Sequence, residues 1–508
     1  MCWRLREADN RSVCAHVLIR LGEYADAATA GCPAAPDAGG VRSTSSGNEH
    51  RSSCVILLLA CPLSGPGSET RLLKERAVSK RDRGQYHTPR RCPIFVRNSS
   101  VGREHATSEW TRHGESFYDL GVPMRSFAGK VKRKLVDVWG RHHVGPLYSP
   151  DPADLDRQRH LDEALQWLKR AQDAGTDRGV AYGVMFGQDF DASYPETTGY
   201  ICQTFVQQAQ VSGDTDLLRR AIEMADWEIA IQLPEGAVMG GRINAHPTPA
   251  VFNTGMVLLG WSALIGRTGE DRFKQAARRA SDWLVSIQET DGTWVRGHSQ
   301  YSNAGSTLYN VKAAWGLCEA GKALGEERYI RAAVRNAEYC LSRQMPNGWL
   351  PDCCLSDPLL PLLHTLAYSM QGLIGIGKIT GRGDLIDCAR RLADAEIRIM
   401  RSDGFIPGRQ DSTFRPAVEW CCLTGSAQTS MVWSELYLLT HEEKYRAAVL
   451  RINRYLMARH DIRNPDLRLR GGVPGSWPVW GDYGRLRILN WATKFLVDAL
   501  ALEAKISS

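Results

Sequence analysis

The 508-residue chain contains no stretch of about 18 consecutive apolar residues, so no part of it is expected to cross a bilayer as a helix. It also lacks a sustained excess of charge of one sign. Residues 1–150 carry 23 Lys and Arg against 14 Asp and Glu, a net +9, whereas the rest of the chain nets −2. Nucleic acid is therefore not an expected partner. The acidic DxDD and DDxxD motifs of terpene cyclases are missing, and Asp189-Phe190-Asp191 is the nearest approach to them.

A regular cysteine framework is also missing, although the chain has 14 cysteines. Six of them fall within residues 1–123. Of the other eight, Cys202, Cys318, Cys340 and Cys388 lie in helical segments, and the rest form the adjacent pairs 353–354 and 421–422. Lone thiols in such segments behave as small hydrophobic side chains. This usage favours a reducing compartment, so a cytoplasmic protein is expected, with the periplasm as the alternative. No cofactor is expected, and the sequence does not indicate an oligomeric state.

Residues 1–123 show neither a helical nor an alternating apolar period and are rich in Arg, Ser, Gly and Pro. No methionine occurs between Met1 and Met124. We therefore expect this segment to be either a disordered extension or the product of a wrongly assigned start, with translation beginning near Met124. Residues 124–154 form a basic lead-in, and residues 155–508 form the folded domain.

Within residues 155–508, one helical pattern recurs at a nearly fixed period. Each copy has a short turn written like SGD or TGE, a helix with one charged face, and a Gly-rich loop with an aromatic residue. Successive copies start 56, 56, 56 and 60 residues apart. Such a period predicts stacked supersecondary units. The five aligned copies cover residues 211–232, 267–288, 323–344, 379–400 and 439–460.

Counting helices gives an all-α fold of six helical hairpins. More apolar helices begin near Gly199, Thr254, Tyr309, Thr365, Leu423 and Asn490. The last of these, 490–505, has no partner after it, and the first charged-face helix, 155–174, has none before it. Pairing of the two closes a ring with six apolar helices inside six amphipathic ones, an (α/α)6 toroid. The alternative is an open solenoid, which normally ends in polar capping repeats, and the apolar segment 490–504 is not one.

All short turns then lie at one end of the ring, and the long outer-to-inner loops all lie at the other, where function concentrates. These loops are rich in aromatic residues, Arg, His and carboxylates, which suits a sugar with apolar ring faces and many hydroxyls. The expected partner is a polysaccharide or oligosaccharide. The six loops cover residues 180–200, 234–253, 290–310, 346–364, 402–425 and 461–492.

Polar residues that do not recur in every copy are the better catalytic candidates. The first long loop is the densest, and its Glu196 stands where an inner helix starts, so a helix-capping role is the alternative for that residue. His246, His298 and His364 occupy three successive loops, with satisfied structural histidines as the alternative. The predicted catalytic residues are Asp189, Asp191, Tyr194, Glu196, His246, His298, Tyr301 and Glu419.

Aromatic and basic side chains of the same loops are the candidates for binding sugar. Arginines can neutralise the carboxylate of a uronic sugar. Arg242, Arg415 and Arg468 are candidates for this role, together with Arg409 and Arg470. Trp294 and Trp349 belong to the recurring motifs DGxW and NGxW, so both can instead be structural wedges that pack between repeats. The predicted binding residues are Trp294, Trp349, Trp420, Trp477, Trp480, Tyr483, Arg409 and Arg470.

One further motif, Glu419-Trp420-Cys421-Cys422, can be read as a zinc site with Asp352-Cys353-Cys354 in the neighbouring loop. It is similar to the Glu-x-Cys and Cys-Cys ligands of toroidal beta-L-arabinofuranosidases. The two motifs occur in the reverse order here, and the residues around them differ. Small buried thiols are therefore the favoured interpretation.

The layout resembles the six-hairpin glycosidase-like superfamily. The words YPETTGY (194–200), CLTGSAQ (422–428) and the closing segment 471–500 resemble those of largely uncharacterised toroid proteins of bacterial exopolysaccharide and capsule clusters, sometimes labelled prenyltransferase-like. The similarity covers about residues 180–505. It implies a fold and a carbohydrate setting, and it does not fix the reaction.

Three functions remain open at this point. A glycoside hydrolase would use one protonated carboxyl and one carboxylate, drawn from Asp189 or Asp191 with Glu196 or Glu419. A lyase or C5-epimerase acting on a uronate polysaccharide would use Tyr or His, with Arg on the sugar carboxylate. A non-catalytic glycan-binding or assembly protein would show no cooperating pair.

Overall fold

The computed structural model describes Val138, Gly140 and residues 142–299, 301, 308–355 and 357–507. The expectations for residues 1–123 lie outside the described residues. Six inner helices alternate along the described chain with six outer helices. The inner helices are α5 (Pro195–Ser212), α7 (Val251–Thr268), α9 (Val311–Leu324), α11 (Leu363–Thr380), α13 (Leu423–Thr440) and α15 (Asn490–Ser507). The outer helices are α4 (Arg157–Asp173), α6 (Thr215–Ala230), α8 (Asp271–Ser286), α10 (Glu327–Ser342), α12 (Gly383–Ile399) and α14 (Glu443–Met457).

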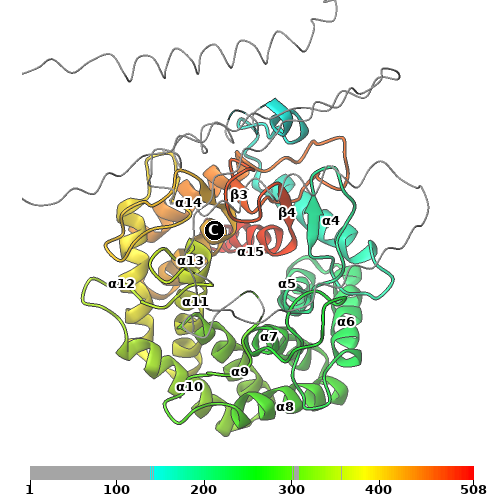
Figure 1. Ribbon diagram of the computed structural model, residues 1–508, viewed down its shortest axis with the longest axis vertical. Coiled ribbons are helices and arrows are strands. Elements are labelled where there is room, and N and C mark those ends of the chain that lie inside the picture. The colour runs from blue at the N-terminus through cyan, green and yellow to red at the C-terminus, as the bar shows by residue number, and fades with distance from the viewer. Residues whose placement is uncertain are drawn as a thin grey trace, which may run out of the picture. The chain divides into compact units, whose positions relative to one another are not determined.

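The predicted (α/α)6 toroid is confirmed. Each inner helix packs on its two inner neighbours, and α15 packs on α5, α13 and the outer helix α4, so the ring closes as expected (Figure 1). The inner helices are buried nearly all round, whereas the outer helices bury one face. No helix of the described part of the chain is long and apolar enough to cross a bilayer.

Inner helices approach one another closely through glycines. A Cβ placed on Gly316 of α9 would lie 1.9 Å from the carbonyl oxygen of Gly255 on α7. No side chain fits at that distance, so the tight inner circle depends on the absence of one.

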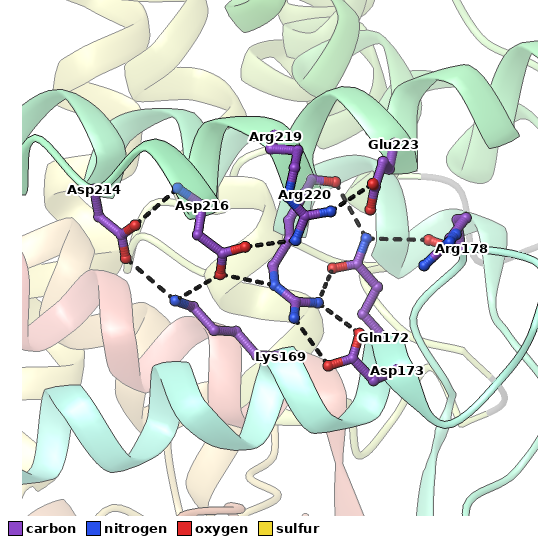
Figure 2. A network of polar contacts seen from close by, with 9 residues as sticks. All are labelled: Lys169, Gln172, Asp173, Arg178, Asp214, Asp216, Arg219, Arg220 and Glu223. Atoms are coloured by element: carbon purple, nitrogen blue, oxygen red, sulfur yellow. Dashed lines mark hydrogen bonds and ion pairs between the residues drawn. The ribbon is translucent and has the colours of Figure 1, made fainter.

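Neighbouring outer helices are joined by a recurring glutamine. Gln172, just before the end of α4, donates from Nε2 to the carbonyl oxygens of Arg178 and Arg220, at 3.3 and 3.1 Å (Figure 2). Its Oε1 accepts from the Arg220 guanidinium at 3.1 Å. The same amide-to-carbonyl and guanidinium-to-amide pattern recurs after α6, α8 and α10, which explains a repeat of nearly constant length. The later pairs are Gln232–Arg279, Gln288–Arg335 and Gln344–Arg391.

The six long loops form a hydrogen-bonded circle at the end of the ring where the inner helices begin, which we call the mouth. Two short antiparallel ladders belong to it. In one, β1 (Gly183–Met185) pairs with β4 (Arg487–Leu489), and in the other β2 (Cys421–Cys422) pairs with β3 (Ser476–Trp477). The remaining neighbours are joined by Ile243–Ser193, Val251–Gly297, Leu308–Asp352 and the Leu362–Arg409 bridge.

The seam where the ring closes departs from the glutamine pattern. His460 stands after α14, and its Nδ1 lies 2.9 Å from Nδ1 of His160 on α4. Nε2 of His160 faces the carbonyl oxygen of Asp154 at 3.0 Å, so Nε2 carries the hydrogen and His160 Nδ1 accepts from His460. Burial lowers the pKa of both imidazoles, that of His460 to about 3 with help from His160. Both rings are therefore neutral in the closed seam at neutral pH.

The close approach of loop and outer helix predicts an unequal effect of two glycine substitutions. Gly292 has a φ of 88°, and a Cβ there would lie 2.5 Å from the carbonyl carbon of Arg335. Gly269 has a similar φ of 70° with nothing within 4 Å of the added atom. We expect Gly292→Ala to lower the free energy of unfolding by roughly 1–3 kcal/mol more than Gly269→Ala, in thermal or urea unfolding. Equal losses would contradict a steric role for this contact.

The buried histidine seam predicts acid sensitivity. Because the folded pKa of His460 lies below its unfolded value, the contribution of the neutral pair is present above pH about 6.5 and declines as the pH falls. Between pH 7.5 and 5.5 the wild type should lose roughly 1–2 kcal/mol more stability than a His460→Gln variant, whose amide resembles those of Gln232, Gln288 and Gln344. Unfolding at both pH values tests this, with the exposed His246→Gln as control. The same pH response in wild type and His460→Gln would refute it.

Candidate functional site

Glu196 lies at the mouth, in the first turn of α5. Pro195 opens the helix and suits that position because it lacks an N–H, and Tyr194 precedes it in an extended conformation. The Tyr194 hydroxyl donates to Glu196 Oε2 at 2.6 Å. Burial raises the pKa of Glu196 to about 7, although the hydrogen bond from Tyr194 acts in the opposite direction. Solvent still reaches part of the side chain, so this carboxyl can exchange a proton near neutral pH.

Two further tyrosines stand beside this carboxyl. Tyr200 of α5 and Tyr368 of α11 are 1% and 3% exposed. Burial raises the pKa of both well above the usual value, and the charge of Glu196 adds to that effect. Both phenols therefore remain protonated at neutral pH and act as hydrogen-bond donors rather than bases.

His364, in the first turn of α11, is the buried imidazole of this cluster. Its ring centroid lies 4.3 Å from that of Tyr368 and 5.3 Å from that of Tyr483. Its Nδ1 lies 2.5 Å from Oε1 of Gln428 on α13. Burial lowers the pKa of His364 to about 4, so the ring is neutral at pH 7 and one nitrogen is free to accept a proton.

A cationic group adjoins the phenols. Asp191 accepts from Arg242 at 2.9 Å and also from Arg487, which comes from the last loop. Both guanidiniums lie over the ring of Tyr182, at 5.4 and 5.5 Å from its centroid. The Tyr182 ring in turn lies 5.3 Å from that of Tyr194. The two arginines and one aspartate of this trio therefore carry a net charge of about +1.

The closing helix completes the aromatic lining. Trp491 of α15 meets the edge of Tyr182 at 4.7 Å between centroids and donates from Nε1 to the Tyr483 hydroxyl at 2.8 Å. Tyr483 then contacts His364, so the first loop, the last loop and α11 are linked side chain by side chain. The cluster can contact a polar ring through its aromatic faces, donate hydrogen bonds from its phenols, and exchange a proton at Glu196.

The structure thus brings together three of the predicted catalytic residues, Asp191, Tyr194 and Glu196, with the predicted binding residue Tyr483. Tyr301 is 42% exposed, yet it lies close enough to raise the pKa of Tyr182, which burial chiefly raises to about 12.

The other predicted catalytic residues lie apart from this cluster. The side chain of Asp189 is 93% exposed and pairs with Arg468 at 2.8 Å. His246 and Glu419 are exposed as well. His298 is half-buried, and its Nε2 has no hydrogen-bond partner among the described residues.

Trp294 and Trp349 occupy the core and not the mouth. They are 0% and 2% exposed, and Trp294 donates from Nε1 to the carbonyl oxygen of Leu284 at 2.9 Å. Burial therefore supports the wedge interpretation for both. Trp420 is half-buried, and its ring lies so close to Gly408 that a Cβ there would be 2.1 Å away.

The remaining predicted binding residues lie on the loops around the mouth. Trp477 and Trp480 line a groove of about 450 Å³ together with Tyr148 and Arg459. Two arginines hydrogen-bond to loop backbone. Arg409 donates to the carbonyl oxygen of Leu360 at 2.6 Å, and Arg470 donates to that of Asn464 at 2.9 Å.

The residues of the zinc motif do not converge. Cys421 Sγ lies 3.2 Å from the Ser426 hydroxyl, and Cys422 Sγ accepts from the amide of Gly425 at 3.4 Å. Burial raises the pKa of these thiols to about 11 and about 12, while Glu419 is exposed. Within the described ranges, no group of three His, Cys, Asp or Glu side chains is placed to hold a metal ion.

Sequence reasoning missed several members of the cluster, namely Tyr182, Tyr368, Arg487, Trp491 and, deeper in the ring, Lys312. The signal was available for some of them. Lys312 interrupts the apolar run of α9, and Gln371 does the same in α11, whereas Gln428 stands among Ser and Thr residues in α13. A polar residue on an otherwise buried helix needs a partner, which marks it for attention.

No protein-family model matches the chain, and no curated protein matches it in sequence. Solved structures do match it in fold. A heparin-specific unsaturated glucuronyl hydrolase is 16% identical with a TM-score of 0.56, over 69% of this chain and 97% of its own. Cellobiose 2-epimerase from Bacillus thermoamylovorans is 11% identical with a TM-score of 0.56, over 68% and 98%. D-mannose isomerase is 12% identical with a TM-score of 0.55, over 71% and 100%. These likenesses show the (α/α)6 toroid fold.

The raised pKa of Glu196 predicts a pH-dependent contribution to stability. The folded pKa exceeds the unfolded one, so folding takes up a proton between them, and this stabilisation is complete at low pH and lost as the pH rises through about 7. Relative to Glu196→Gln, the wild type should therefore lose of the order of 1–3 kcal/mol between pH 5 and 8. Urea unfolding across this range tests it, with the exposed Glu235→Gln as control. A constant difference between wild type and Glu196→Gln would show that the carboxyl titrates normally.

Proposed function

We propose that the protein is an enzyme that transfers a proton on a uronate residue of a saccharide, as a C5-epimerase or a lyase does. The observation that carries this proposal is the joining of Glu196, which titrates near neutrality, to the Arg242–Asp191–Arg487 trio through Tyr194 and Tyr182.

Removal of the C5 proton places negative charge next to the sugar carboxylate. A positive charge beside that carboxylate stabilises the developing anion. The trio offers one such charge, and its Arg242 and Arg487 side chains are 39% and 17% exposed. A bound uronate would supply the second carboxylate that the two guanidiniums lack, and a neutral sugar would not.

The proton itself needs a base and an acid on opposite sides of the ring carbon. Neutral His364 can accept a proton at pH 7, and Glu196 can donate or accept one near its pKa of about 7. The buried phenols of Tyr200 and Tyr368 keep their protons and can hydrogen-bond the sugar hydroxyls. An epimerase returns the proton to the opposite face, whereas a lyase expels the group at C4.

A glycoside hydrolase remains the second candidate, because a buried carboxyl with a pKa near 7 is also what protonates a glycosidic oxygen. A hydrolase also needs a second carboxylate, and the candidates for it are less suitable. Asp191 is held by two guanidiniums, and Asp189 and Glu419 are exposed.

The two reactions leave different products. We expect wild-type protein incubated with heparosan, alginate or polygalacturonate in deuterium oxide to give either deuterium at C5 or the ultraviolet absorbance of an unsaturated uronate. Glu196→Gln should lower kcat by at least about 100-fold. Arg487→Met should raise KM for the uronate polymer, and the surface control Glu235→Gln should change neither constant.

Release of reducing ends without deuterium or absorbance would replace this proposal with the hydrolase. Binding of the same polymers without turnover by any route would leave a glycan-binding protein.

A further inference from the structure

Three helices of the inner circle share a buried chain of polar side chains. The Lys312 amine of α9 donates to Oε1 of Gln371 on α11 at 2.8 Å. The same oxygen accepts from Nε2 of Gln428 on α13 at 3.3 Å. Gln428 Oε1 then meets Nδ1 of His364 at 2.5 Å. All four side chains are buried, at 7% exposure or less.

Ring packing does not explain this chain. An amine in an apolar interior is expensive to bury, and an aliphatic side chain of similar volume would normally be the more stable choice. The nearby Lys494 forms an ion pair with Asp498 at 2.6 Å. Lys312 instead contacts the side-chain oxygen of Gln371 and the ring of Trp315, whose centroid is 4.2 Å from the amine. A buried polar group that lowers stability points to a role in ordering its neighbours.

Donor and acceptor roles along the chain follow from its first member. Burial, with the charge of Lys494 adding to it, lowers the pKa of Lys312 well below its usual value. An amine donates to a carbonyl oxygen whether it is charged or neutral, and the atom of Gln371 that faces Lys312 is that oxygen. That oxygen can receive only a donor from Gln428, which must therefore turn its NH₂ toward Gln371 and its carbonyl oxygen toward His364. A carbonyl oxygen only accepts, so Nδ1 of His364 carries the hydrogen. The lone pair of the neutral ring is then on Nε2.

We propose that Lys312, Gln371 and Gln428 are positioning residues that fix the Nδ1–H tautomer of His364 and so direct its basic Nε2 to the substrate. No described residue hydrogen-bonds to that Nε2. The tautomer assignment depends only on the hydrogen-bond chain, and the role of Nε2 as a base rests on the proposed function above. The two parts can therefore fail separately.

Nitrogen NMR of full-length protein labelled at histidine with ¹⁵N tests the assignment without substrate. A His364→Asn variant identifies the signal that belongs to His364. We expect a single neutral Nδ1–H tautomer in the wild type. Gln428→Leu should give a mixture of tautomers, and Gln428→Glu, which still accepts from Nδ1, should keep the Nδ1–H form. Gln208→Leu, a buried glutamine of α5 outside the chain, is the matched control and should leave the signal unchanged.

Kinetics on the uronate polymer that proves active supply the second readout. Gln428→Leu and Lys312→Met should lower kcat about 10- to 100-fold with KM nearly unchanged, because binding groups are intact and only the base is misoriented. Gln428→Glu should recover most of kcat.

An Nε2–H tautomer in the wild type would overturn the inference even if the enzyme is active. An unchanged tautomer in both Gln428→Leu and Lys312→Met would overturn it as well. The Nδ1–H tautomer in a protein inactive on all uronate polymers would support the chain and remove the proposed function.

Discussion

Closure of the ring by α15 is the constraint on which the site depends. The last helix buries its apolar surface against α4, α5 and α13, and this brings the first and last loops together. Asp191 and Arg487 are 296 residues apart in sequence and pair only because the ends of the ring meet. Trp491, on the closing helix itself, is what joins Tyr182 to Tyr483. An open array of the same helices would leave the cationic trio and the aromatic lining in separate halves.

The repeat and its exceptions have different tasks. Residues that recur join the hairpins, as the glutamines after α6, α8 and α10 do, and as Thr198 and Thr254 do when they accept from the loop amides of Val180 and Val238. Residues that break the pattern do something local. His460 replaces the glutamine where the seam must close, and Lys312 interrupts an apolar helix at the start of the polar chain that ends at His364 of α11. The chemistry of the mouth is therefore concentrated in the departures from the repeat.

This division between recurring and non-recurring residues explains which features could be predicted from the sequence. Periodicity predicted the hairpins, the closure and the mouth, because each rests on local pattern and on burial of apolar faces. The dense first loop pointed to Tyr194 and Glu196, which the structure places in one cluster. The role of Trp294 and Trp349 was ambiguous because their motif recurs in the repeats, where it serves packing. Arg487 and Tyr182 were missed because their role comes from a contact between distant loops, which no local window contains.

The balance of charge around Glu196 decides which way a proton moves. The start of α5 and the Tyr194 hydroxyl both favour the carboxylate, yet burial outweighs them and raises the pKa to about 7. A uronate bound by the arginine trio adds a negative charge nearby, which raises that pKa further. Under the proposed function, Glu196 would enter such a complex protonated, and His364, whose pKa burial lowers to about 4, would enter it neutral. In that proposal the charge of the substrate would help to assign the acid to α5 and the base to α11, which a neutral sugar would not do.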